Sequence, residues 1–206
     1  MELLAAVCIG LGLSAAGGLR VFVPLLIAGI AQRLDMVHLA PALAWTSSWT
    51  ALAVLGALSI AEGVGYCVPI VDHALDAISA PAGWLAGALL SIGLVAPELH
   101  STLASGDQLN GLVGHALYAT GLGAVAASGV AAAGIAQATS AGGRVISTAT
   151  TGGIANPFYA AAESVLATVA SVLAVLTPIV LAIGALLLVG VTFMIIRKRR
   201  RALKLA

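Results

Sequence analysis

Charged residues are scarce in this chain, and so are aromatic ones. Of its 206 residues, 8% are charged and 4% are aromatic, whereas 61% are hydrophobic. A soluble domain carries about 25% charged residues, so this composition excludes a water-soluble enzyme. The mean hydropathy is +1.10, and several apolar runs approach the roughly 20 residues that cross a bilayer as a helix. The composition therefore predicts a membrane protein.

Cysteines are few, and the common metal-binding motifs are missing. Cys8 and Cys67 lie in apolar stretches without CxxC spacing, so neither a disulfide nor a zinc site is predicted. No HExxH pair occurs in the sequence, and we expect neither a metal nor a cofactor. Because the N-terminus lacks the positive region of a signal peptide, residues 3–17 are interpreted as a retained first span.

Basic residues are concentrated at the C-terminus. Six of the nine lie in the last ten positions: Arg197, Lys198, Arg199, Arg200, Arg201 and Lys204. Such a block after a span marks the cytoplasmic side and is attracted to the anionic lipids there. We interpret 197–206 as a cytoplasmic tail rather than a nucleic-acid-binding one. The protein is then expected in the bacterial inner membrane with both termini in the cytoplasm.

Seven apolar segments follow one another along the chain: 3–17, 20–32, 49–68, 81–97, 110–137, 158–176 and 178–196. The segment 20–32 is short and contains Pro24, which predicts a helix broken within the membrane or a re-entrant half-helix. Such a break must face protein or a wet cavity. Longer polar loops are predicted at 33–48 and 98–109. We therefore expect an all-α polytopic bundle of about six spans, forming a single domain over 1–206.

An internal repeat is visible in this sequence. PAGWLAGALLSIG from Pro81 aligns with PIVLAIGALLLVG from Pro178. The same order of an arginine, a glutamate and a proline-led helix thus occurs twice: Arg20, Glu62 and Pro81, then Arg144, Glu163 and Pro178. The order predicts related halves at about 1–97 and 110–196. Halves with three crossings each would be inverted, which is a recurring plan of secondary transporters.

Four ionisable residues fall in or beside the predicted spans: Arg20, Glu62, Arg144 and Glu163. A charged side chain at the bilayer centre costs roughly 2.5–3.5 kcal/mol, so such residues usually face the bundle interior and have partners there. We therefore predict that the arginines lie close to the glutamates. One interpretation is a centre that binds an anionic head group or relays protons. The other is a pair of structural ion pairs that lock the halves together.

Other polar residues form secondary candidates. Asp72 and Asp76 share a helix face, with His73 beside Asp76. They predict a cation or proton site, or the acidic start of an ordinary helix. His115 is interpreted as a hydrogen-bonded core residue or a proton relay.

A polar segment precedes the span of Glu163. It comprises Thr148, Thr150, Thr151, Gly152, Gly153 and Asn156. We predict a flexible turn here, in which hydroxyls and open amides beside Arg144 could coordinate an anion. Capping of the following helix explains Asn156 equally well.

These residues resemble a known family. Gly18-Leu19-Arg20, then Glu62-x6-Pro69-x2-Asp72-x3-Asp76 and Pro81-x-Gly83, are similar to the bacterial domain-of-unknown-function 4126 family of small membrane proteins. The second half is similar too, in Arg144, Thr151-Gly152, Asn156 and Glu163. The likeness covers nearly the whole chain. It implies a membrane location and brings no established activity.

The expected function is passage of a small solute, an ion or a lipid head group at the interface between the halves. The alternative is a non-transporting membrane scaffold or accessory subunit. A membrane-embedded enzyme that uses Asp72, His73 and Asp76 is a third possibility. The expected partners are the lipid bilayer and a small ion or head group, without nucleic acid. Gly83-x-x-x-Gly87 and other glycine-rich faces allow self-association or serve internal packing.

Overall fold

The computed structural model describes residues 3–66, 69–105 and 111–176. Over these ranges the chain is helical and contains no strand, which confirms the all-α prediction. The elements are α1 (Leu3–Leu19), α2 (Phe22–Arg33), the 3-10 helix η1 (Pro41–Ser47), α3 (Trp49–Gly65), α4 (Pro69–Ser105), α5 (Leu112–Thr151) and α6 (Asn156–Leu176). The last apolar segment and the basic tail lie outside the described residues.

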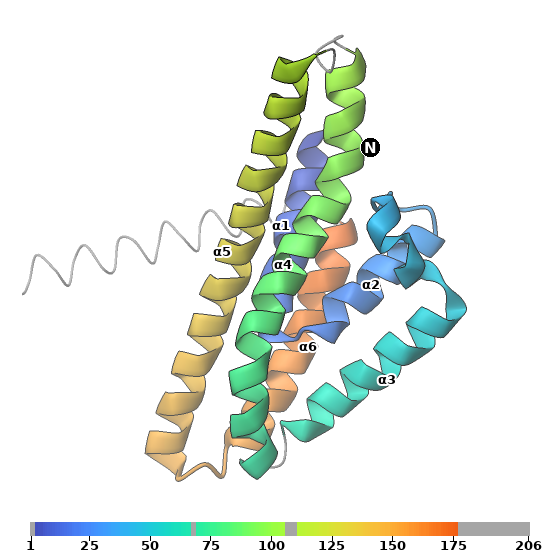
Figure 1. Cartoon of the computed structure of the whole chain (residues 1–206). Coiled ribbons are helices and arrows are strands. Elements are labelled where there is room, and N and C mark those ends of the chain that lie inside the picture. Colours follow the sequence, from blue (N-terminus) through green and yellow to red (C-terminus); the bar gives the residue numbers. More distant parts are fainter. Residues whose placement is uncertain (1–2, 67–68, 106–110, 177–206) are drawn as a thin grey trace, which may run out of the picture.

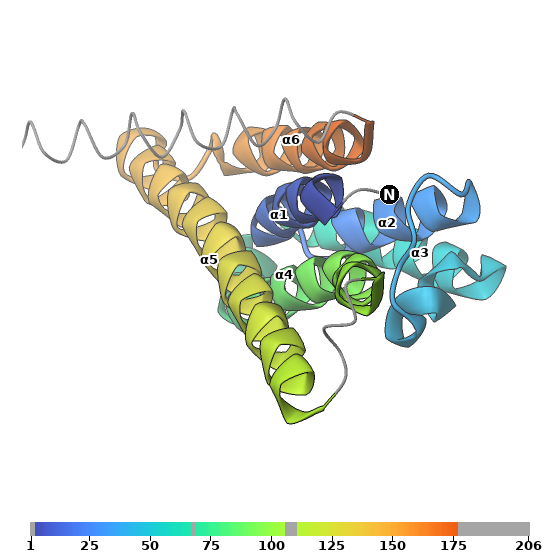
Figure 2. The same cartoon turned by 90° about the horizontal axis from the view of Figure 1, so that it is seen from above.

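Helix α1 is the centre of the bundle. It contacts α2, α4, α5 and α6, and it lies between α6 and the pair formed by α4 and α5 (Figure 2). Leu13 and Ser14 on α1 have no exposed surface, as expected for a helix that is apolar all round. Helices α2 and α3 extend from one side of this bundle (Figure 1).

Three described helices are long and apolar enough to cross a membrane. The spans are Ile78–Ala104 within α4, Val113–Thr151 within α5, and α6; a fourth results if η1 and α3, bent by 76°, count as one. Only 11% of the α5 window is buried. Because its apolar side chains would otherwise face water, this helix is suited to contact with lipid. The chain is thus an integral membrane protein by the composition and length of its helices.

The predicted interruption after α1 is confirmed. Helix α1 ends at Leu19 and α2 begins at Phe22, although the N–H of Arg20 still donates to Ala16 at 3.0 Å. Arg20 is only 1% exposed. The break therefore faces the protein interior, as non-helical backbone in lipid requires.

Two predicted loops are wrong in part, because helices extend into them. Helix α4 continues to Ser105 with Pro81 and Pro97 inside it, so residues 98–105 are not a loop. A proline removes one helical hydrogen bond, but a helix packed along its length against α1 and α5 tolerates that loss. The predicted turn near Thr148 is likewise helical as far as Thr151.

The true turn before α6 is shorter than predicted. Gly152 and Gly153 have φ of +64° and +89°, a conformation that glycine adopts without steric cost and that commonly ends helices. The hydroxyls of Thr150 and Thr151 donate to carbonyls of their own helix, those of Ile146 and Ser147, each at 2.8 Å. These threonines therefore extend α5 rather than forming a polar turn.

Small residues allow α1, α4 and α5 to approach closely. A Cβ at Gly87 of α4 would lie 2.7 Å from the carbonyl oxygen of Gly129 on α5. The hydroxyl of Ser14 on α1 donates to the carbonyl of Gly87 at 2.7 Å and is hydrogen-bonded to the hydroxyl of Ser91 at 2.9 Å. Gly87 therefore serves internal packing, as small residues commonly do between membrane helices.

Candidate functional site

The arginine at the helix break is held by α6. Its Nε donates to the hydroxyl of Ser164 at 2.9 Å, and its Nη2 donates to the carbonyl of Ala160 at 2.7 Å. Nη2 also lies 3.4 Å from the carboxylate of Glu163. Because the first turns of α6 supply all three groups, Arg20 joins the break to α6.

Glu62 holds the same break through the backbone. One carboxylate oxygen accepts the N–H of Val21 at 2.9 Å, and the other accepts that of Phe22 at 3.2 Å. These amides begin α2, where backbone N–H groups lack helical partners and the helix dipole favours a negative charge. The sequence predicted a guanidinium partner for this glutamate; the structure gives it the start of a helix.

Arg144 and Glu163 form the second part of the cluster. Nη2 of Arg144, on α5, donates to Oε2 of Glu163, and the hydroxyl of Ser140 donates to Oε1. Glu163 therefore binds both arginines. Its exposed fraction is 5%, and that of Arg144 is 7%. The structure thus brings all four predicted residues together in the interior, which is the arrangement that lipid imposes on charged side chains.

Tyr66 is a member of this cluster that sequence reasoning missed. The Cζ atoms of Arg20 and Arg144 lie 4.0 and 4.2 Å from the centroid of its ring, within the range of cation–π attraction. Its hydroxyl is hydrogen-bonded to that of Ser79 on α4. A tyrosine four residues after Glu62 occupies the same helix face, and this spacing is the feature that could have identified it.

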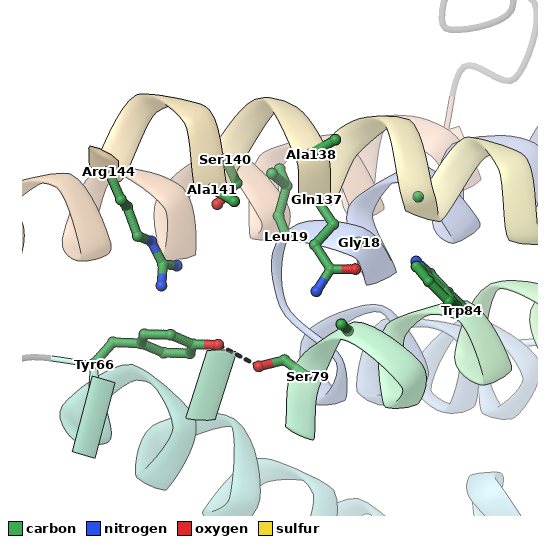
Figure 3. Close-up of a pocket in the computed structure, with 12 residues that line it drawn as sticks. Gly18, Leu19, Tyr66, Ser79, Trp84, Gln137, Ala138, Ser140, Ala141 and Arg144 are labelled. Carbon is green, nitrogen blue, oxygen red and sulfur yellow. Dashed lines mark hydrogen bonds between the residues drawn. The ribbon is translucent and has the colours of Figure 1, made fainter. Parts of the chain in front are cut away.

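A pocket of about 290 Å³ adjoins the cluster, between α1, α4, α5 and the end of α3. Its polar lining residues are Tyr66, Ser79, Gln137, Ser140 and Arg144. Figure 3 shows Arg144 above the ring of Tyr66 at one end of the pocket and Trp84 at the other, with Gln137 between them. Oε1 of Gln137 is buried and has no hydrogen-bond partner among the described atoms. The pocket therefore offers a cation and an amide to a polar ligand.

The structure describes the side chains of only some of the secondary candidates, and these have local roles. Asp72, His73 and Asp76 belong to the first turns of α4, and their side chains lie outside the described part of the structure. His115 is exposed, and its Nδ1 lies 2.8 Å from the carbonyl of Gly111 at the start of α5. Asn156 donates to the hydroxyl of Thr148 at 3.0 Å.

These contacts give His115 and Asn156 roles at helix ends. Among the side chains that the structure describes, no group of three or more histidine, cysteine, aspartate or glutamate residues could hold a metal ion.

Comparison with known proteins identifies the family of this chain. The searches of curated proteins and of solved structures found no match. A family model does match, over nearly the whole length and including all four residues of the charged cluster. The chain belongs to the family described as a domain of unknown function (DUF4126), whose model matches residues 7–198.

Proposed function

We propose that this protein moves a small anion, or the anionic head group of a lipid, across the membrane, and that the pocket beside Arg144 is its binding site. The observation that carries the proposal is a guanidinium in the wall of a pocket of about 290 Å³ within an apolar bundle. In a medium of low dielectric constant a fixed cation attracts an anion strongly. The side-chain NH₂ of Gln137, which also lines the pocket, is a second group that can donate to the same ligand.

The helix break supports movement rather than binding alone. Transporters often bind their substrate where a helix is interrupted and where two related parts of the chain meet. Here Arg20 occupies the break between α1 and α2 and contacts α6. A substrate that binds beside Arg144 lies next to Glu163, whose carboxylate also contacts Arg20 at the break. Displacement of Glu163 by that substrate would loosen Arg20 as well.

The inverted halves are part of this proposal. Glu62 and Glu163 are followed by Gly63 and Ser164, and a Cβ on Gly63 would lie 3.7 Å from the Ser164 hydroxyl. The two glutamate helices thus meet at equivalent positions, which supports a two-fold relation between the halves. The C-terminal basic residues, 197–206, are proposed to lie in the cytoplasm, as their charge indicates. The membrane that we propose is the bacterial inner membrane.

Flux through proteoliposomes tests the proposal. Chloride, acetate and inorganic phosphate serve as soluble probes, and phosphatidylglycerol with a fluorescent label serves as the lipid probe. We expect transfer of at least one probe above the rate of protein-free liposomes, and its loss in Arg144→Gln. Arg33→Gln is the matched control, because Arg33 is exposed on α2 and stacks on Trp49. Rates in the wild type equal to those of empty liposomes would refute the proposal.

A non-transporting scaffold is the second candidate, and the close packing of α1, α4 and α5 favours it. Gly87 and Gly129 allow these helices no added methyl group without displacement. In a scaffold the charged cluster only fixes the helix arrangement. Glu62→Gln and Arg144→Gln would then reduce the yield of folded protein, and no probe would cross the bilayer in either variant or in the wild type.

A further inference from the structure

The pocket beside Arg144 has a polar end and an apolar end. Tyr66, Ser79, Ser140 and Arg144 line the polar end. Gly134 precedes Arg144 by ten residues on α5, which corresponds to about 15 Å of helix. At that distance the walls are formed by small residues and by the indole of Trp84 (Figure 3). The pocket thus changes from charged to apolar along its length.

The apolar end also opens toward the outside of the bundle. Trp84 is 46% exposed, and Ala138 and Ala141, which line the same pocket, are exposed. Their neighbours Leu85 and Ile135 are exposed as well. Apolar side chains on a membrane-spanning surface face lipid, so a molecule reaches this part of the pocket from the bilayer.

We infer that the ligand of this pocket is an anionic amphiphile that enters sideways between α4 and α5. Its negatively charged head group binds at Arg144, and its acyl chain passes the small residues of α5 and the indole of Trp84 into the lipid. The inference rests on the proposed function and narrows its substrate to a lipid-borne anion. Both ends of such a molecule match the pocket: charge against guanidinium and chain against apolar wall.

Quenching of Trp84 by a brominated amphiphile tests this inference. The chain has three tryptophans, and Trp45→Phe with Trp49→Phe leaves Trp84 as the sole reporter. The protein is placed in phosphatidylcholine nanodiscs and titrated with 9,10-dibromostearate, with the methyl ester of the same acid as the uncharged control. We expect saturable quenching by the acid and at least tenfold weaker binding of the ester.

Two pairs of variants separate the head-group contact from the chain contact. Arg144→Gln should weaken binding of the acid at least tenfold, whereas Arg33→Gln should not change it. Ala138→Phe fills the apolar end without touching the charged cluster and should also weaken binding. Ala127→Phe, at an exposed position of α5 outside the pocket, should leave binding unchanged and serves as the control for the added ring.

Specific outcomes would overturn the inference. Equal quenching by the acid and the ester would show that the charge contributes nothing to binding. Displacement of the acid by acetate as readily as by stearate would show that the acyl chain contributes nothing. Different results would refute the inference and the proposed function.

Flux of a soluble anion without binding of the brominated acid would refute the inference alone. Saturable binding of the acid without transfer of any probe would refute transport and leave the amphiphile site in place.

Discussion

Glu62 accepts a hydrogen bond from the backbone N–H of Val21 at 2.9 Å, so a carboxylate on α3 fixes the point where α1 passes into α2. Glu163 fixes the same point from α6, through the side chain of Arg20. The two glutamates that the sequence repeat pairs with each other thus act on one break, one through backbone and one through side chain. The break is consequently the place where most of the described helices are coupled.

Glu163→Gln should be the most destabilising single change in the charged cluster. Arg20 and Arg144 both contact this carboxylate, so the substitution removes a negative charge that two buried guanidiniums share. Removing one partner of a buried ion pair costs about 3–5 kcal/mol. Thermal unfolding in detergent measures the effect. Asp35→Asn, at an exposed position, is the control, since asparagine also tolerates its positive φ of 54°. An unchanged midpoint for Glu163→Gln would contradict the prediction.

Glu62→Gln should loosen the start of α2 without dispersing the arginines. A glutamine has one acceptor oxygen, and its NH₂ group cannot accept the second of the two amides that Glu62 now binds. An unsatisfied buried donor costs about 1–3 kcal/mol. Hydrogen exchange followed by mass spectrometry should show faster exchange at Val21 and Phe22. The buried middle of α1 provides the internal reference; equal protection of both segments in variant and wild type would argue against the cap.

The charged cluster was predictable because lipid leaves few alternatives. Four ionisable residues in apolar sequence must face inward and find one another, whatever the details of the fold. Their exact partners were not predictable in this way. The amides at the start of α2 became partners of Glu62 only because α3 folds back against the break. Tyr66 belongs to the cluster because its ring lies close to two arginines that are distant from it in sequence.

Helix boundaries show a different limit of sequence reasoning. The sequence predicts a span that starts at Pro81, yet α4 begins at Pro69 and runs through both later prolines. The local penalty of a proline is fixed, whereas the stabilisation from packing depends on neighbours. Helix α4 has α1 and α5 along its length. Where tertiary contacts are this extensive, a local breaker does not end the helix.

Gly87→Ala should separate α4 from α5, whereas Gly56→Ala should stabilise the protein. A Cβ at Gly87 would meet Gly129 and Ala133 at 2.7 and 2.9 Å, both on a rigid helix, but nothing lies within 4 Å of a Cβ at Gly56. Overpacking costs about 1–3 kcal/mol. Alanine in place of a helical glycine in open space gains about 0.5–1 kcal/mol. Unfolding midpoints in the same detergent compare the two, and a loss of stability in both variants would contradict the packing argument.

Ser79→Ala should cost more stability than Tyr66→Phe, because the hydrogen bond between these residues has a direction. The hydroxyl of Ser79 donates its single proton to the carbonyl of Leu75, so Tyr66 is the donor to Ser79. Phenylalanine removes the donor and leaves Ser79 bonded to Leu75, and it keeps the ring against both arginines. Alanine at position 79 instead removes two hydrogen bonds, the one to Leu75 and the one from Tyr66, and each hydrogen bond contributes about 0.5–1.5 kcal/mol. In the double variant the hydrogen bond between Tyr66 and Ser79 is already absent. Adding Ser79→Ala to Tyr66→Phe should therefore cost only the hydrogen bond to Leu75.

Thermal unfolding of the wild type, both single variants and the double variant compares the stabilities of the four proteins. A greater loss in Tyr66→Phe than in Ser79→Ala would reverse the assigned direction.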